Sequence, residues 1–158
     1  KLDAGTVKLA QNKVSIRHLI DRAASPLAIP MDLRNQTLTV HCMEESVNCD
    51  LVWTAEALGN ILKNCMEHTP EGGIITVTAS ETALYTQIKV TDTGSGFDAK
   101  VIPHLFERFY KGSNASENSY GIGLALARTV ITSQNGTIQA MNGEIGAKFV
   151  MKFYKQVI

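Results

Sequence analysis

The sequence predicts a single α+β domain in which helices cover one face of a mixed β-sheet. Apolar residues recur at helical spacing in residues 16–23 and 51–62. Apolar and polar residues instead alternate in residues 74–79 and 85–91, as in half-buried strands. The later strands come in hairpin-like pairs and do not alternate regularly with helices. We therefore expect a two-layer α/β sandwich rather than a doubly wound parallel sheet.

Length and composition limit the possible classes of protein. A chain of 158 residues can bury one core without disulfides or a structural metal. Its 15 basic and 15 acidic side chains balance, which argues against a general affinity for nucleic acid or an anionic membrane. The three cysteines lack close metal-ligand spacing and are typical of reduced thiols in the cytosol. No apolar run approaches the ~20 residues of a membrane span. Because the chain opens at Lys1, we expect an excised piece of a larger protein.

The N-terminal part of the chain is expected to contain an extended segment, a turn and one helix. Residues 6–10 are predicted as extended and residues 11–13 as a polar turn. The helix should begin near Ser15. It should kink or end through Pro26 and Pro30, because proline lacks a backbone donor.

The longest predicted helix starts after Asp50, a residue type that often caps helices. Before it, residues 36–42 and 46–49 are predicted to pair as a short hairpin. The other predicted elements are strands at 74–79, 85–91, 137–141 and 148–154, short helical pieces at 102–109 and a helix at 123–133.

Two asparagines on the long helix are the first candidate functional residues. Asn60 and Asn64 are one helical turn apart, so both amides lie on the same side of the helix. For two asparagines alone, satisfied amides at the edge of the core are the commoner explanation. The motifs that follow in the sequence reverse that balance.

A second candidate is the segment DTGSG, directly after the strand at 85–91. Asp92 at the end of a strand can accept a hydrogen bond from an exocyclic amine. Gly94 and Gly96 allow a ligand to approach the backbone closely. An aspartate-glycine turn after a strand is also common without any function, so the segment alone is weak evidence.

Two further segments could contact phosphate groups. Arg108 and Lys111 are three residues apart and could present two positive charges, although a solvated basic pair has the same pattern. Gly121 and Gly123 open a helix, whose first backbone N–H groups form a ready anion site. The chain has no G-x-x-x-x-G-K-[ST] sequence, which excludes an ordinary P-loop.

The order of these motifs resembles the catalytic, ATP-binding domain of bacterial sensor histidine kinases, a domain of the GHKL class. The N, G1, F and G2 boxes of that family correspond to Asn60-x3-Asn64, Asp92-x-Gly94-x-Gly96, Phe106-x2-Phe109 and Gly121-x-Gly123-Leu124. The resemblance covers residues 1–154, and residues 1–6 are similar to the junction that follows the dimerisation helices. It implies one domain over residues 1–158 with the Bergerat-type ATP-binding fold of the family, in which residues 112–120 form the ATP lid.

The resemblance also implies a role for the matched residues. Asn64 should hold Mg²⁺, and Asn60 should contact phosphate or the water shell of the metal ion. Asp92 should receive the adenine amine, while Gly94 and Gly96 let the base lie against the backbone.

Further residues are implied as contacts to ATP. Lys111, helped by Arg108, should bind phosphates, and His68 lies where the family has a residue near the nucleotide. The set is completed by Leu105, Tyr110, Gly121, Ile122, Gly123 and Leu124. The implied catalytic residues are Asn60, Asn64, Arg108 and Lys111.

Three residues depart from the pattern of the family. Glu67 stands where many members carry lysine, Ala125 replaces a frequent glycine, and Ala147 replaces the threonine of a G-T-x-F ending. None of these changes removes a direct ligand, so we expect ATP binding to survive with modest affinity.

The implied activity is transfer of the γ-phosphoryl group of MgATP to a histidine on a separate dimerisation domain. In the family a carboxylate directly follows that histidine, and none of His18, His41, His68 and His104 meets this condition. The expected partners are therefore the dimerisation domain and a cognate response regulator, with no nucleic acid. We expect a cytoplasmic domain whose parent protein is anchored in the membrane by other parts.

Two other functions are compatible with the same fold. ATP-hydrolysing relatives, such as the gyrase, mismatch-repair and heat-shock chaperone ATPases, carry a glutamate one turn before the metal asparagine as general base. Asn60 occupies that place here, Glu56 is a further turn away and Glu67 follows Asn64. A degenerate nucleotide-binding interaction module would need a broken metal or adenine site, yet Asn64 and Asp92 are both present.

Overall fold

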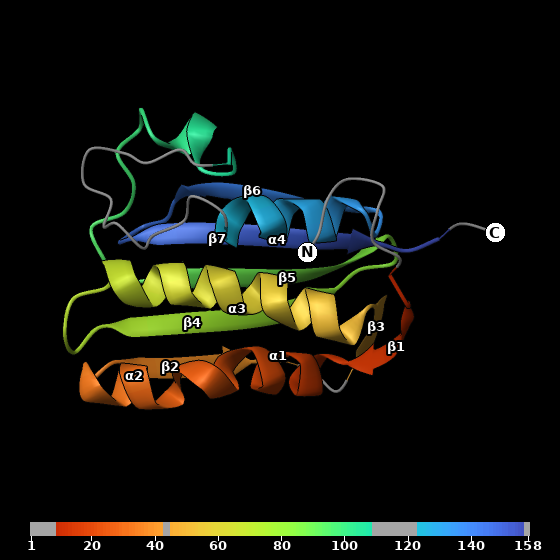
Figure 1. Ribbon diagram of the computed structural model, residues 1–158, viewed down its shortest axis with the longest axis horizontal. Helices are drawn as coiled ribbons and strands as arrows, with labels where there is room; N and C mark the ends of the chain where they lie inside the picture. The colour runs from red at the N-terminus through yellow and green to blue at the C-terminus, as the bar shows by residue number, and fades with distance from the viewer. Residues whose placement is uncertain (1–8, 43–44, 109–122, 157–158) are drawn as a thin grey trace.

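The computed structural model describes residues 9–42, 45–108 and 123–156 (Figure 1). Over these residues the helices are α1 (Ile16–Ala24), α2 (Ala28–Leu33), α3 (Leu51–His68) and α4 (Gly123–Thr132), with the 3-10 turns η1 (Ser25–Leu27) and η2 (Ile102–His104). The strands are β1 (Asn12–Ser15), β2 (Thr37–His41), β3 (Ser46–Cys49), β4 (Ile74–Glu81), β5 (Tyr85–Asp92), β6 (Gly136–Asn142) and β7 (Ala147–Tyr154).

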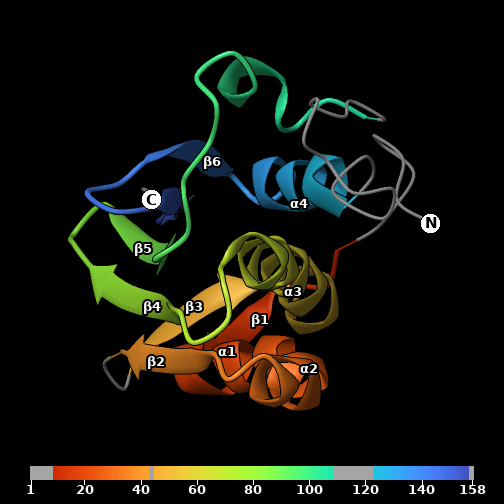
Figure 2. The same ribbon diagram turned by 90° about the vertical axis from the view of Figure 1, so that its left-hand side faces the viewer.

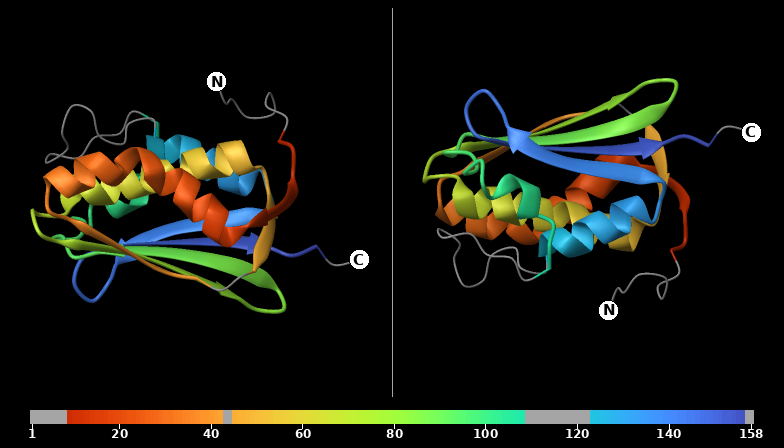
Figure 3. Two further views of the ribbon diagram at one scale, coloured as in Figure 1. Left: turned by 90° about the horizontal axis from the view of Figure 1, so that it is seen from below. Right: turned by 90° about the horizontal axis from the view of Figure 1, so that it is seen from above.

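The strands β2-β4-β5-β7-β6 form one mixed sheet, in that order. β2 runs parallel to β4, and the other neighbours are antiparallel. α1, α3 and α4 lie side by side on one face of this sheet, with α3 in the middle (Figures 1 and 3). β1 and β3 form a separate two-stranded sheet at one end of the molecule. The predicted two-layer sandwich with helices on one face is confirmed.

The core lies between the helices and the sheet, because each layer turns its apolar side chains toward the other. On β5, Ile88 and Val90 are buried and alternate with half-buried polar residues. Ile61 and Leu62 of α3 and Phe149 of β7 are also buried. α3 therefore packs in the middle of the core, which fixes the directions in which its polar residues can point.

Side chains cap the starts of α1 and α3, as predicted. Ser15 Oγ accepts a hydrogen bond from the His18 N–H at the start of α1, with an N···O distance of 3.2 Å. Asp50 Oδ1 accepts one from the Trp53 N–H at the start of α3, at 2.9 Å. Within the described residues, none of the helices is long and apolar enough to cross a membrane.

Prolines shape two of the shorter helical segments. Pro26 lies in η1 and Pro30 in α2, so the first helix is interrupted as predicted. The helical pieces predicted at 102–109 are reduced to η2, and the described residues that follow are turns and bends. The Leu105 N–H bonds to the Ile102 carbonyl, three residues back, which is the short-range pattern of a 3-10 turn.

The prediction for the first residues of the domain is wrong. Residues 12–13 of the predicted polar turn at 11–13 belong to β1, which pairs antiparallel with β3. Of the predicted extended segment at 6–10, residues 9–10 lie outside any strand, and residues 6–8 are outside the described part of the chain. The polar composition concealed β1, because only Val14 in this strand is buried.

The predicted hairpin between residues 36–42 and 46–49 is also wrong. β2 instead pairs in parallel with β4, where Leu38 lies opposite Ile75, and β3 pairs with β1. The hairpin prediction rested on closeness in the sequence alone. Pairing with β4 lets β2 continue the apolar face of the sheet under the helices, which a two-stranded hairpin could not provide.

Candidate functional site

Asp92, the last residue of β5, is a buried carboxylate whose two oxygens have different surroundings. Oδ1 accepts hydrogen bonds from the backbone N–H groups of Gly94 at 2.9 Å and of Ala147 at 3.0 Å. Oδ2 is buried, and within the described residues it has no hydrogen-bond partner. A buried acceptor without a donor costs free energy, so Oδ2 is suited to receive an N–H group from a ligand.

Glycines bring the backbone close to Asp92. A Cβ atom on Gly94 would lie 2.3 Å from the carbonyl oxygen of His68 at the end of α3. A Cβ on Gly146 would lie 2.4 Å from both the carbonyl oxygen and Oδ1 of Asp92. Only glycine fits at these two positions without a shift of the backbone. The end of α3 therefore packs directly against the loop after β5, and Figure 2 views α3 along its axis.

The two asparagines of α3 differ in their surroundings. Asn60 is half-buried, and its Nδ2 donates a hydrogen bond to the carbonyl oxygen of Gly123 at 3.1 Å. This bond ties α3 to the first residue of α4. Asn64 is 4% exposed, and its Nδ2 is buried without a hydrogen-bond partner among the described residues. Asn64 is thus a polar side chain in an apolar helix face whose hydrogen-bonding capacity is not used up by the fold.

Among the described residues, the surroundings of Asn64 do not form a metal site of their own. Within the described part of the chain, no group of three or more histidine, cysteine, aspartate or glutamate side chains could hold a metal. A metal ion here would depend on an amide oxygen together with oxygens of a bound ligand. Mg²⁺ is commonly bound in this way, with few protein ligands, several waters and substrate phosphates.

Cys65 follows Asn64 on α3 and lies close to Asp92. Burial raises the pKa of the Cys65 thiol well above its usual range, and the charge of Asp92 raises this pKa further. The thiol therefore stays neutral, so that no second negative charge is placed beside Asp92. Thr69 Oγ1 donates a hydrogen bond to the Cys65 carbonyl at 2.6 Å, which closes the last turn of α3.

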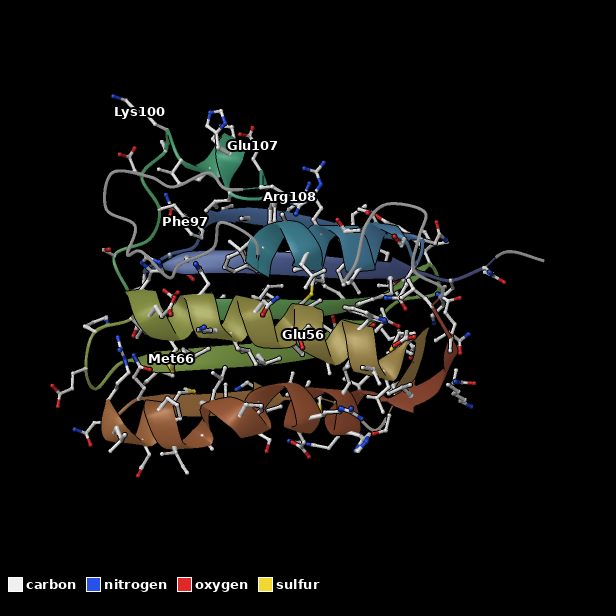
Figure 4. The ribbon with its side chains drawn as sticks, in the orientation of Figure 1. Glu56, Met66, Phe97, Lys100, Glu107 and Arg108 are labelled. Atoms are coloured by element: carbon white, nitrogen blue, oxygen red, sulfur yellow. The ribbon has the colours of Figure 1, made fainter. Side chains whose placement is uncertain are left out.

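The other expected site residues that the structure describes come from the end of α3 and from the segment around η2. His68 is the half-buried last residue of α3. Leu105 is buried in the core after η2, and the Phe106 ring packs edge-on against Phe149 with centroids 6.4 Å apart. Arg108 is exposed and lies after η2, on the side of the molecule away from β2 (Figure 4).

The glycine motif before α4 is described only in part. Gly123 is the first residue of α4, and Leu124 is buried in the core, so only the backbone of Leu124 could face a ligand. The remaining expected site residues, Phe109, Tyr110, Lys111, Gly121, Ile122 and the lid at 112–120, lie outside the described residues.

The turn between β6 and β7 contacts Asp92 and the loop after β5, and of this region the sequence analysis singled out only Ala147. Asn142 Oδ1 accepts a hydrogen bond from the Phe97 N–H at 2.7 Å, and Asn142 Nδ2 donates to the Phe97 carbonyl at 3.1 Å. Gly146 and Ala147 contact Asp92 as described above. The available signal was the pair of glycines flanking a tight turn, Gly143 and Gly146, directly before the last strand.

Residues 49–157 match the family described as "Histidine kinase-, DNA gyrase B-, and HSP90-like ATPase". The chain belongs to this family. The match includes all four candidate motifs, the Asp92 carboxylate and the turn that holds it. Membership assigns nucleotide binding to the domain in general terms.

Individual members of the family resemble the chain over most of its length. Sensor histidine kinase YvrG of Bacillus subtilis is 36% identical over 68% of the chain, and Sensor protein CreC of Escherichia coli is 33% identical over 84%. The chain spans 19% of YvrG and 28% of CreC, and so corresponds to a part of each.

Solved structures share the fold. The catalytic domain of histidine kinase ThkA superimposes with a TM-score of 0.83 at 21% identity, and covers 93% of this chain and 99% of its own. Full-length ShkA, in complex with AMPPNP, superimposes with a TM-score of 0.81 at 21% identity, over 97% of this chain and 33% of its own. At this level of identity the likeness establishes the fold alone.

Proposed function

We propose that the domain binds MgATP and donates the γ-phosphoryl group to a histidine on the dimerisation domain of its parent sensor kinase. The family, and relatives named as sensor histidine kinases, support this proposal. ShkA, which has the same fold, was solved with AMPPNP bound. The observation that carries the proposal is the Asp92 carboxylate, because its geometry favours a base with an exocyclic amine.

The adenine would lie between the end of α3 and the loop after β5. Two backbone N–H groups hold Oδ1 of Asp92, so the carboxylate has one orientation and Oδ2 accepts the adenine amine. Gly94 and Gly96 let the loop backbone lie close to His68 and Asn142, where a side chain would clash, and the base would rest against this backbone. A base that presents a carbonyl oxygen at that position, as guanine does, would place a hydrogen-bond acceptor against the acceptor Oδ2 and be rejected.

The asparagines of α3 would hold the phosphate end of the nucleotide. Asn64 would ligate Mg²⁺ through its amide oxygen, and the ion would neutralise the phosphate charge that develops in the transfer. Asn60 keeps its Nδ2 on the Gly123 carbonyl, so its oxygen is turned to phosphate-bound water or the hydration shell of the ion. Arg108, Lys111 and the backbone of Gly121–Leu124 would add positive charge and N–H donors.

Asn60 favours transfer over hydrolysis. An amide is not a general base, so this position cannot take a proton from an attacking water molecule. Glu56 is exposed, and Glu67 is on the other side of Asn64 along α3. The site therefore positions the phosphate chain and stabilises its charge, while the nucleophile has to come from another molecule or domain.

The acceptor and the receiving partner would lie outside this chain. None of the four histidines is followed directly by a carboxylate in the sequence. The dimerisation domain of the parent kinase would supply the acceptor histidine, and a cognate response regulator would take the phosphoryl group from it. We place the domain in the cytoplasm, attached to a membrane-anchored parent protein.

The proposal can be tested with labelled MgATP. The domain is incubated alone and with a separately made dimerisation segment that carries the histidine, and both phosphohistidine and free phosphate are measured. We expect label on the segment only when both are present. Rapid release of phosphate without the segment would favour an ATPase. Failure to bind nucleotide would favour a degenerate interaction module.

A further inference from the structure

Asn142 makes a two-armed contact with the backbone of Phe97. It is the last residue of β6, and both halves of its amide bond the same residue, with N···O distances of 2.7 Å from the Phe97 N–H and 3.1 Å to the Phe97 carbonyl. The two residues are 45 positions apart in the sequence. One exposed side chain therefore supplies the donor and the acceptor that a neighbouring strand would otherwise supply.

The contact holds the far end of the glycine loop. The near end is fixed at Thr93, whose Oγ1 accepts the Ile74 N–H at 2.9 Å, and at Asp92 by Ala147. Phe97 ends the loop, and its ring packs edge-on against Phe149 with centroids 5.6 Å apart. Figure 4 shows Phe97 on the segment that leads from β5 to η2.

The loop between these fixed ends needs an external support. It contains Gly94 and Gly96, and glycine loses more conformational freedom on ordering than any other residue. Gly96 has a φ of +80°, and a Cβ there would lie 2.6 Å from Asn142 Oδ1. The amide of Asn142 thus occupies the space that a side chain at position 96 would need, and only glycine at this position lets Asn142 reach the loop.

We propose that Asn142 is a positioning residue for nucleotide binding, which holds the Gly94–Gly96 backbone in the shape against which the adenine rests. The inference rests on the proposed function, because it assumes that the base lies on this loop. Asn142 itself is placed on the side of the loop toward β6, so it acts through the backbone of Phe97 rather than by touching the nucleotide.

The test compares Asn142→Ala with Asn12→Ala. Asn12 is an exposed asparagine on β1 whose Nδ2 also bonds a backbone carbonyl, that of Ala10, at the opposite end of the molecule. Affinities for MgATP, adenosine and magnesium tripolyphosphate are measured by displacement of a fluorescent ATP analogue, together with the melting temperature of each variant.

For Asn142→Ala we expect MgATP and adenosine to bind about tenfold more weakly, the effect of losing two modest hydrogen bonds. Tripolyphosphate should bind as to the unmodified chain, since it does not use the loop. Asn142→Asp keeps the acceptor for the Phe97 N–H and should restore part of the adenosine affinity. Asn12→Ala should change neither affinity.

Unchanged adenosine binding in Asn142→Ala would overturn the inference, and so would an equal loss for tripolyphosphate, which would indicate a general structural defect. The failure of the proposed function looks different, because the unmodified chain would then bind neither MgATP nor adenosine. If Asn142→Ala melts at a much lower temperature, the affinities of Asn142→Asp and of the unmodified chain for adenosine and tripolyphosphate are compared instead. Unchanged adenosine binding, or an equal loss for tripolyphosphate, would then overturn the inference.

Discussion

The two carboxylate oxygens of Asp92 differ in whether they are free to bind a ligand. Oδ1 is held by the backbone N–H groups of Gly94 and Ala147, and Oδ2 has no partner among the described residues. Asp92→Asn would direct an N–H at the adenine amine or lose the negative charge that attracts it. We expect MgATP to bind about 10- to 100-fold more weakly, the range for a charge-assisted hydrogen bond, in a calorimetric titration.

Asp98→Asn is the matched control for this substitution. Asp98 Oδ1 accepts the Lys100 N–H at 3.0 Å, with the same two-residue spacing as Asp92 and Gly94, but Asp98 is exposed. This variant should bind MgATP like the unmodified chain. Unchanged affinity in Asp92→Asn, or an equal loss in both variants, would show that Asp92 does not select the base.

Among the elements of the fold, the turn between β6 and β7 contacts the Asp92 carboxylate through Gly146. A Cβ at this residue would lie 2.4 Å from Asp92 Oδ1 and 2.8 Å from the Gly94 nitrogen, so the turn would have to move away. We expect Gly146→Ala to lower the free energy of unfolding by about 1–3 kcal/mol, as overpacking does, and to weaken MgATP binding. Urea unfolding and calorimetry measure the two effects.

Gly143→Ala, in the same turn, separates crowding from a general effect of alanine. The nearest atom to a Cβ on Gly143 is the Gly146 carbonyl oxygen, at 3.5 Å, an ordinary contact. Its stability and affinity should stay near those of the unmodified chain. If both glycine variants behave alike, the close approach of Gly146 to Asp92 is not what the turn requires.

The elements that the sequence predicted well are those whose causes are local. The cap at Asp50 and the alternation in β4 and β5 depend on neighbours within a few residues. The partners of β1 and β2 depend on which distant strand completes the sheet or the core, and local patterns do not contain that information. The predicted hairpin failed for this reason.

The same distinction applies to the site. Asp92, Gly94 and Asn64 could be identified because their spacing along one strand or helix makes a motif. Asn142 could not, because its partner Phe97 is brought to it by the pairing of β5 with β7 and of β7 with β6. A single asparagine at the end of a strand has no local pattern that distinguishes it from a surface residue.

At the scale of the whole molecule, buried thiols should make the free energy of unfolding fall as the pH becomes alkaline. Burial is the main cause that raises the pKa of Cys49 to about 11, with Asp50 adding to it and Thr54 opposing it. In the unfolded chain the thiol titrates near its ordinary pKa, so its contribution is present below about pH 9 and is lost as the pH rises toward 11. We expect a loss of roughly 2–3 kcal/mol of unfolding free energy across this interval.

The measurement is urea unfolding at several pH values between neutral and alkaline, for the unmodified chain and for Cys49→Ala. The variant should be less stable at neutral pH, because a buried side chain is truncated, but its stability should fall less steeply above about pH 9. Parallel pH profiles for the two proteins would show that Cys49 does not titrate in this interval.

At the same scale, the proposed function is transfer of the γ-phosphoryl group to a histidine without hydrolysis of ATP. Asn60 bonds the first residue of α4 and stands where a general base would activate water. Asn60→Glu introduces a carboxylate at this position, and it should release free phosphate from MgATP faster than the unmodified chain while still binding the nucleotide. Lys63→Glu, an exposed change on the same helix, is the control and should not do so.

The most direct measurement is the ratio of phosphohistidine formed to phosphate released, with labelled MgATP, the domain and the dimerisation segment together. For the unmodified chain the account predicts that nearly all label leaving ATP is found on the histidine, and that Asn60→Glu shifts the ratio toward free phosphate. Rapid release of phosphate by the unmodified chain, with no label on the histidine, would contradict the account.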